Sequence, residues 1–150
     1  MMETTWVLVA DGSRARIFET LKEIHTFSEI QFFDNPEGRA STREINTDAE
    51  GRFAQKGGGL QGHTSAPQAN AIEHDVELFA KQVAQYLDHA RTQARYDKLS
   101  IIAPPKFLGL MRHNLGKEVR KLVDQEIARD VSWFDAKDIR NYFEESKQKR

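Results

Sequence analysis

The sequence contains no cysteine, so it cannot form a disulfide framework, and this suits a protein of the reducing cytosol. It also contains no apolar run near the roughly 18 residues that a membrane-spanning helix requires. Its first apolar stretch covers residues 6–10 alone, which is too short for a signal peptide and is typical of a strand. We therefore expect a cytoplasmic protein that does not insert into a membrane.

An excess of charge of one sign is absent as well. The 22 basic and 23 acidic side chains leave a formal net charge of -1, which gives no general attraction to nucleic acid. We expect no DNA partner, and an RNA partner would need a local basic patch. The length of 150 residues predicts a single domain, which can bury roughly 70% of its extended-chain surface.

Recognisable metal-ligand and nucleophile motifs are also missing. The five histidines follow no ligand spacing, and no serine lies in a Gly-x-Ser-x-Gly elbow, so we expect no metal and no cofactor. One alternative is a ribonuclease H-like metal site in which Asp11 meets Glu73, Asp75 and Asp130. Turn chemistry explains Asp11, however, and the helix dipole explains the acidic residues that begin the long helix.

The N-terminal third has the pattern of three antiparallel strands. Residues 6–10 form an almost continuous apolar run, as in a strand buried on both faces. Asp11 and Gly12 favour a hairpin turn, and apolar residues then alternate with polar ones over residues 14–19. A third strand is predicted within residues 24–33.

A long insert follows, at about residues 34–67, which holds six of the nine glycines and no hydrophobic period. A stretch of this length without periodicity is usually functional or disordered. A long helix comes next, with a stripe that includes Ile72, Val83 and Leu87. Asn70, with Glu73 three residues later, resembles a capping box at its start.

The C-terminal half alternates between strands and helices. A strand is predicted at residues 99–103, one or two helices within residues 107–123, a strand through Ile127, Val131 and Trp133, and a last helix capped by Asp135. Parallel neighbours and right-handed crossovers follow from this order. The predicted fold is α/β, a mixed five-stranded sheet with packed helices in one domain of residues 1–143, before a charged tail at residues 144–150. This arrangement resembles ribonuclease H-like domains.

A basic segment stands out in the otherwise neutral chain. It carries five cations against the single carboxylate of Glu118, and they are Lys106, Arg112, Lys117, Arg120 and Lys121. The last three lie at helical spacing on one face, where they could neutralise RNA phosphates. The other reading, a solvated helix face, is equally consistent with this pattern.

Three stretches of the chain resemble one bacterial family. They are WVLVADGSRARIFE, the Gly-rich insert, and IIAPPKFLGLMRHNLGKEVRKLV, which together cover residues 5–143 nearly throughout. The chain is identified by them as a member of the family named "protein required for attachment to host cells". That family is similar to the central domain of archaeal and eukaryotic peptide-chain release factors and of Pelota, which implies the mixed sheet predicted above.

The resemblance gives the insert a possible chemistry. In release factors a Gly-Gly-Gln tip before the long helix helps to place the water that cleaves peptidyl-tRNA. The corresponding stretch here has Gly58, Gly59, Gln61, Gly62 and His63, with Leu60 between the second glycine and the glutamine. One inserted residue displaces a side chain by about 3.5 Å. A surface loop without chemistry is the alternative for this stretch.

Two functions follow from the sequence. The first is a release-factor-like protein associated with the ribosome or RNA, in which Gln61 promotes peptidyl-tRNA hydrolysis and the basic segment provides the anchor. The alternative is a non-enzymatic binding protein with an indirect role in attachment to host cells. The sequence leaves open whether the protein is an enzyme, and it leaves the oligomeric state open.

Overall fold

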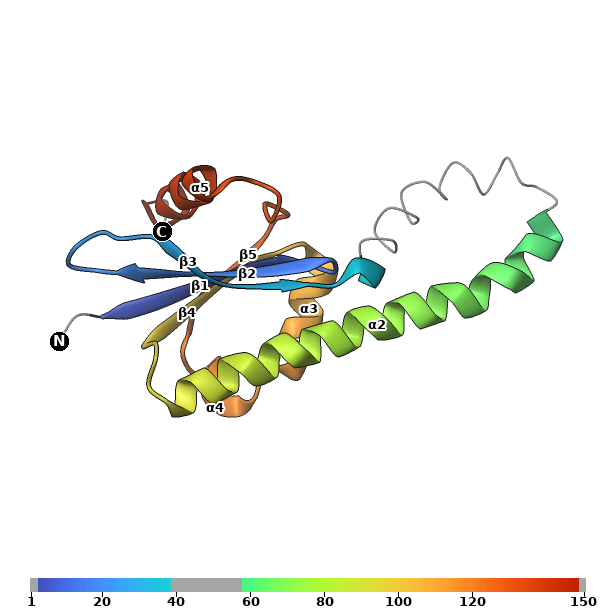
Figure 1. The fold of residues 1–150 in the computed structure, drawn as a ribbon, viewed down its shortest axis with the longest axis horizontal. Coiled ribbons are helices and arrows are strands. Elements are labelled where there is room, and N and C mark those ends of the chain that lie inside the picture. Colours follow the sequence, from blue (N-terminus) through green and yellow to red (C-terminus); the bar gives the residue numbers. More distant parts are fainter. Residues whose placement is uncertain (1–2, 39–57, 149–150) are drawn as a thin grey trace.

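The computed structural model describes residues 3–38 and 58–148, with residues 58–69 described by their backbone alone. These residues form five strands and four helices, and residues 36–38 are helical as well (Figure 1). In chain order the elements are β1 (Thr4–Asp11), β2 (Arg14–Leu21), β3 (Ser28–Asp34), α2 (Gly58–Thr92), β4 (Lys98–Ala103), α3 (Pro105–Asn114), α4 (Lys117–Arg120), β5 (Val123–Ala128) and α5 (Ala136–Gln148).

The strands form one mixed sheet in the order β3-β2-β1-β4-β5. The pairs β1–β2 and β2–β3 are antiparallel, whereas β1–β4 and β4–β5 are parallel. This confirms the predicted meander of three strands followed by two parallel strands. Because parallel strands end at the same edge, the carboxyl ends of β1, β4 and β5 lie together.

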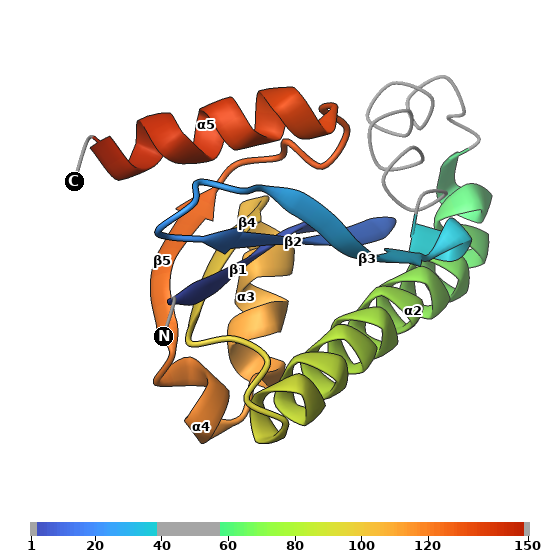
Figure 2. The same cartoon turned by 60° about the vertical axis from the view of Figure 1, so that its left-hand side comes forward.

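The sheet separates two apolar layers. Helices α2, α3 and α4 cover one face, and α5 covers the other (Figure 2). Alternate residues of β1 enter the two layers: Trp6 and Leu8 face α2, while Val7 and Val9 face α5. This double burial explains why the first strand is an unbroken apolar run.

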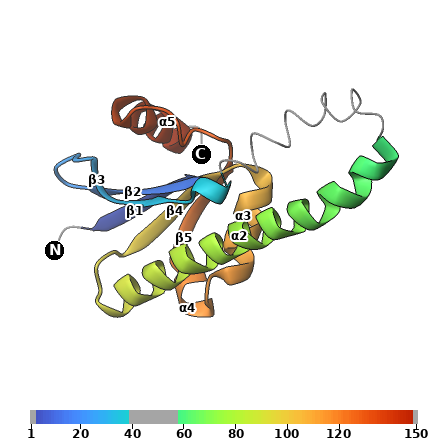
Figure 3. The same cartoon turned by 45° about the vertical axis from the view of Figure 1, so that its right-hand side comes forward.

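Helix α2 begins earlier than the sequence predicted. It starts at Gly58, so Asn70 and Glu73 lie inside the helix and do not cap it. Figure 3 shows its first turns extending beyond the edge of the sheet. The sequence predicted a start at Asn70 because the glycines and Pro67 before it oppose helix formation. The alanines and the glutamine at residues 66–71 favour helix instead. Residues 39–57 of the predicted insert lie outside the described residues.

The C-terminal elements also differ from the prediction. Strand β5 ends at Ala128, so Val131 and Trp133 lie in the loop that follows it. The helical pattern divides into α3 and α4, as one of the two predicted alternatives had it. Helix α5 continues to Gln148 and includes most of the predicted tail. Asp135 caps this helix as predicted, because its Oδ1 accepts a hydrogen bond of 2.8 Å from the Asp138 N–H.

The hairpin turn between β1 and β2 is held between two other segments. On one side, a Cβ on Gly12 would lie 3.4 Å from the side chain of Val76 in α2. On the other, Asn35 donates from Nδ2 to the Gly12 carbonyl at 2.9 Å, and a Cβ on Gly38 would overlap that same carbonyl. Gly38 therefore allows the segment after β3 to approach the backbone of the hairpin turn closely.

Replacing Gly38 with alanine should test this close packing. The added methyl group cannot fit against the Gly12 backbone, so Gly38→Ala should lower the free energy of unfolding by about 1–3 kcal/mol in urea denaturation. Gly109→Ala is the matched control, because a Cβ there meets nothing within 4 Å and lies in helix α3. That variant should be unchanged or more stable by up to about 1 kcal/mol. Equal stability of the two variants would contradict the packing described.

Candidate functional site

A polar cluster lies at the carboxyl edge of the parallel strands, where open α/β sheets usually bind their ligands. Its centre is Asp11, the last residue of β1, which is almost completely buried. The loop after β5 brings Asp130, Ser132 and Trp133 to the same place. This cluster therefore joins the first strand to a segment more than a hundred residues later in the chain.

The Asp11 carboxylate accepts five hydrogen bonds. Its Oδ1 accepts from the Ser13 N–H and hydroxyl, at 2.7 and 2.8 Å, and from the Arg14 N–H at 3.0 Å. Its Oδ2 accepts from the Ser132 hydroxyl and from the Trp133 indole N–H, both at 3.0 Å. A carboxylate offers about four lone-pair positions, so this one is saturated.

Ser132 lies between two carboxylates. Its Oγ is 3.0 Å from Asp11 Oδ2 and 3.1 Å from Asp130 Oδ1, but a hydroxyl has one proton to donate. Both contacts are hydrogen bonds when Asp130 is protonated, because Asp130 then donates to Ser132 and Ser132 donates to Asp11. Burial, and next the charge of Asp11, raise the pKa of Asp130 in agreement with this proton arrangement.

Two arginines of β2 hold the same loop. The guanidinium group of Arg14 stacks on the Trp133 ring, 3.6 Å from its centroid. Arg16 donates from Nη1 to the carbonyls of Ser132, at 3.0 Å, and Phe134, at 2.6 Å. The loop is thus fixed to the β1–β2 hairpin through its backbone and its side chains.

The alternative of a carboxylate metal site gains no support. Asp11 and Asp130 do come together, but Glu73 pairs with Lys106, at 3.2 Å, and not with Asp11. No group of three or more His, Cys, Asp or Glu side chains is placed to hold a metal within the described part of the chain. The Asp11 carboxylate has hydrogen-bond donors where metal ligation would need free lone pairs.

The predicted basic patch is divided between two regions. Lys106 lies at the start of α3, and Arg112 lies near its end with Nε 2.6 Å from Glu126. Of the other three, Lys117 and Arg120 lie on α4 and Lys121 follows it directly and pairs with Glu118 at 3.5 Å. Within the described residues, neither Lys117 nor Arg120 is in an ion pair. Binding of RNA by these residues stays a prediction.

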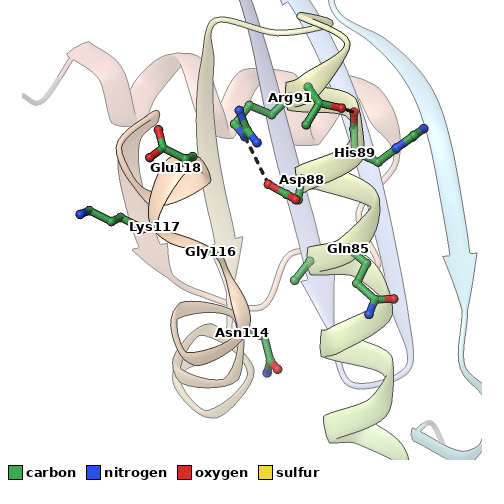
Figure 4. Close-up of a pocket in the computed structure, with 10 residues that line it drawn as sticks. Gln85, Asp88, His89, Arg91, Asn114, Gly116, Lys117 and Glu118 are labelled. Atoms are coloured by element: carbon green, nitrogen blue, oxygen red, sulfur yellow. Dashed lines mark hydrogen bonds and ion pairs between the residues drawn. The ribbon is translucent and has the colours of Figure 1, made fainter.

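A pocket of about 550 Å³ lies between the last turns of α2 and the region of α4 (Figure 4). Its lining presents both polar and apolar surface and consists of Ala84, Gln85, Asp88, His89, Arg91, Thr92, Asn114, Gly116, Lys117 and Glu118. Asp88 and Arg91 form an ion pair of 3.2 Å on α2, at one side of the pocket. The volume is within the range of ligand sites, roughly 300–1,000 Å³.

Comparison with known protein families identifies the family of this chain. The family described as "Protein required for attachment to host cells" matches residues 6–143. The chain belongs to this family. A relative in Rickettsia prowazekii (strain Madrid E), named "Uncharacterized protein RP470", is 39% identical over 128 residues, which cover 83% of this chain and 82% of the relative.

Membership of the host-attachment family confirms one part of the resemblance noted in the sequence. The comparisons do not support the further similarity to release factors. Gly58, Gly59, Gln61, Gly62 and His63 lie on the first turns of α2, where the backbone alone is described. Their predicted roles therefore stay predictions. No described helix is both long and apolar enough to cross a membrane.

Sequence reasoning missed Ser132 and Trp133 as partners of Asp11. It assigned Trp133 to a strand and read Asp11 as turn chemistry alone, which is correct for Oδ1 but not for Oδ2. A tryptophan and a serine directly after a strand, beside Asp130, were the available indication. Only the parallel pairing of β1, β4 and β5 brings them to Asp11.

Asp130→Asn should change how stability depends on pH. Because the native pKa of Asp130 is raised above 3.8, its contribution to stability is fully present below that pH and is lost as pH rises through the native pKa. An asparagine amide would donate to Ser132 at every pH. The variant should therefore not lose this part of its stability as pH rises. The stability of Asp130→Asn relative to wild type should therefore increase as pH rises above about 4.

Urea denaturation across this pH range measures the difference. Glu145→Gln is a suitable control, since it removes an exposed carboxylate from α5 without touching the cluster. A difference between Asp130→Asn and wild type that is constant with pH would exclude the shared-proton arrangement.

Proposed function

We propose that the protein is a non-enzymatic binding protein of the host-attachment family, and that it supports attachment indirectly by binding a polar ligand. The pocket between α2 and α4 is the observation that carries this proposal. Its volume suits a small molecule or a few side chains of a partner, whereas an adhesin binds through a broad surface.

The lining of the pocket favours a ligand that carries both donors and acceptors. Arg91 is oriented by Asp88, so part of its guanidinium group is held in place before a ligand arrives. Asn114 donates from Nδ2 to the Leu110 carbonyl, which leaves its side-chain oxygen as an acceptor. Glu118 lines the opposite side of the pocket, and its carboxylate is paired with Lys121 at 3.5 Å.

A binding role also agrees with the use of Asp11. In the described part of the chain it is the one charged side chain that is buried, and buried charged groups in clefts are the usual candidates for catalysis. Here, however, all of its hydrogen-bonding capacity holds the chain together. The buried carboxylate of Asp11 thus stabilises the fold.

Filling the pocket should abolish the function. Gly116 lines the pocket with a φ of -71°, and a Cβ there meets nothing within 4 Å, so Gly116→Phe can fold while its ring occupies the space. Gly109→Phe is the matched control, because Gly109 is equally open but lies outside the pocket. The measurement is attachment to host cells by a strain that lacks the protein and carries each variant.

Wild type and Gly109→Phe should restore attachment, and Gly116→Phe should leave it at the level of the deletion strain. Gln61→Ala should restore it as wild type does. If Gly116→Phe also restored attachment, the pocket would not carry the function. If Gln61→Ala failed and peptidyl-tRNA release from ribosomes failed with it, the release-factor reading would replace the proposal.

A further inference from the structure

Two buried polar atoms on neighbouring strands have no hydrogen-bond partner within the described residues. They are the hydroxyl oxygen of Ser100 in β4 and the Oε1 of Gln125 in β5. Ser100 is 1% exposed, so bulk water does not reach its hydroxyl. Folded proteins satisfy nearly all of their buried polar groups, and each exception therefore needs a physical explanation.

The sheet brings these two side chains to the same place. Ser100 and Gln125 are paired across the parallel strands β4 and β5. Ser100 shares one face of β4 with Ile102, which packs in the apolar layer beneath α5. Gln125 reaches the same layer, because its Nε2 donates to the Ser146 hydroxyl of α5 at 3.1 Å. Both side chains therefore lie between the sheet and the last helix.

A bulge in β5 produces this arrangement. Leu99 is paired with Val123, but Ser100 is paired with Gln125, so β5 has one residue more than β4 at this point. Val123 packs in the layer that α2 covers, whereas Gln125, two residues later, faces α5. Residues two apart share a face in a regular strand, so the bulge is what places Gln125 on the side of Ser100.

The other neighbours of Ser100 on this face of the sheet are apolar. In β1 it is paired with Val7, and Ile102 and Phe143 belong to the same buried cluster. Turning over the Gln125 amide does not change this, because it exchanges the oxygen with the nitrogen and leaves a polar atom without a partner at that position. A group outside the protein is therefore needed to satisfy both atoms.

From these observations we infer that one water molecule is bound between β4, β5 and α5, where it accepts a hydrogen bond from Ser100 and donates one to Gln125 Oε1. Adjacent strands lie about 4.8 Å apart, a distance that two hydrogen bonds of about 2.8 Å span through one water. The Ser146 hydroxyl accepts from Gln125 and donates to the Phe143 carbonyl at 2.7 Å, which leaves it one lone pair. The cluster thus offers three polar atoms, the usual number of partners of a buried water.

The bound water links the end of the last helix to the two parallel strands. Its hydrogen bonds continue from Ser100 of β4 through Gln125 of β5 to Ser146, which lies near the end of α5. Asp11 fixes the loop before the same helix through Trp133, so α5 is held by polar groups at both of its ends. None of these residues lines the pocket, and the inference is therefore independent of the proposed function.

A crystal structure of the full chain, at a resolution that shows ordered water, tests the site directly. We expect one water within about 2.6–3.2 Å of both Ser100 Oγ and Gln125 Oε1. In crystals of Ser100→Ala the water should be displaced or lost. A direct hydrogen bond between the two side chains, or a dry site, would overturn the inference.

Urea denaturation of Ser100→Ala gives a second test, because the direction of the change differs between the two cases. If water is bound, alanine removes one of its partners, and the midpoint should fall by about 0.5 M. If the hydroxyl is unsatisfied, alanine removes a buried polar group without a partner, and the midpoint should rise. Ser28→Ala is the matched control, since it makes the same change at an exposed position of strand β3. A midpoint for Ser100→Ala equal to or above that of Ser28→Ala would contradict the bound water.

Discussion

The burial of the Asp11 carboxylate is the constraint on which the rest of this structure depends. Burying a charge costs free energy unless hydrogen bonds satisfy it. Here five donors do so, three from residues 13–14 and two from residues 132–133. Three of these bonds shape the turn after β1, and two fix the loop before α5. Asp11 therefore links the end of the first strand to the loop before the last helix, in addition to the apolar packing between β1 and α5.

The residues that fix the loop before α5 and the residues that line the pocket lie in different parts of the structure. Asp11 holds Trp133 in the loop before α5, and Arg16 holds the Phe134 carbonyl of the same loop. The pocket lies instead where α2 ends, next to α4. Helix α2 connects the two regions, because Val76 meets the hairpin turn at Gly12 and Arg91 lines the pocket fifteen residues further along.

Much of the fold could be predicted from hydrophobic periodicity, whereas the cluster could not. The double burial of β1 and the alternation in β2 depend on local sequence, which is why they were predicted correctly. The start of α2 was predicted wrongly, because glycines oppose helix formation while the adjacent alanines favour it. Ser132 and Trp133 meet Asp11 only through sheet topology, and no local pattern encodes a contact across 121 or 122 positions.

The most direct test is a double-mutant cycle between Asp11→Ala and Trp133→Phe, followed by urea denaturation. The phenylalanine removes the indole N–H that donates to Asp11 but keeps an aromatic ring over Arg14. If Asp11 fixes the loop, the two changes should be coupled by about 1–3 kcal/mol in the free energy of unfolding, as for neighbours in one network. Additivity within about 0.5 kcal/mol would show that Asp11 serves the turn alone and would contradict the account.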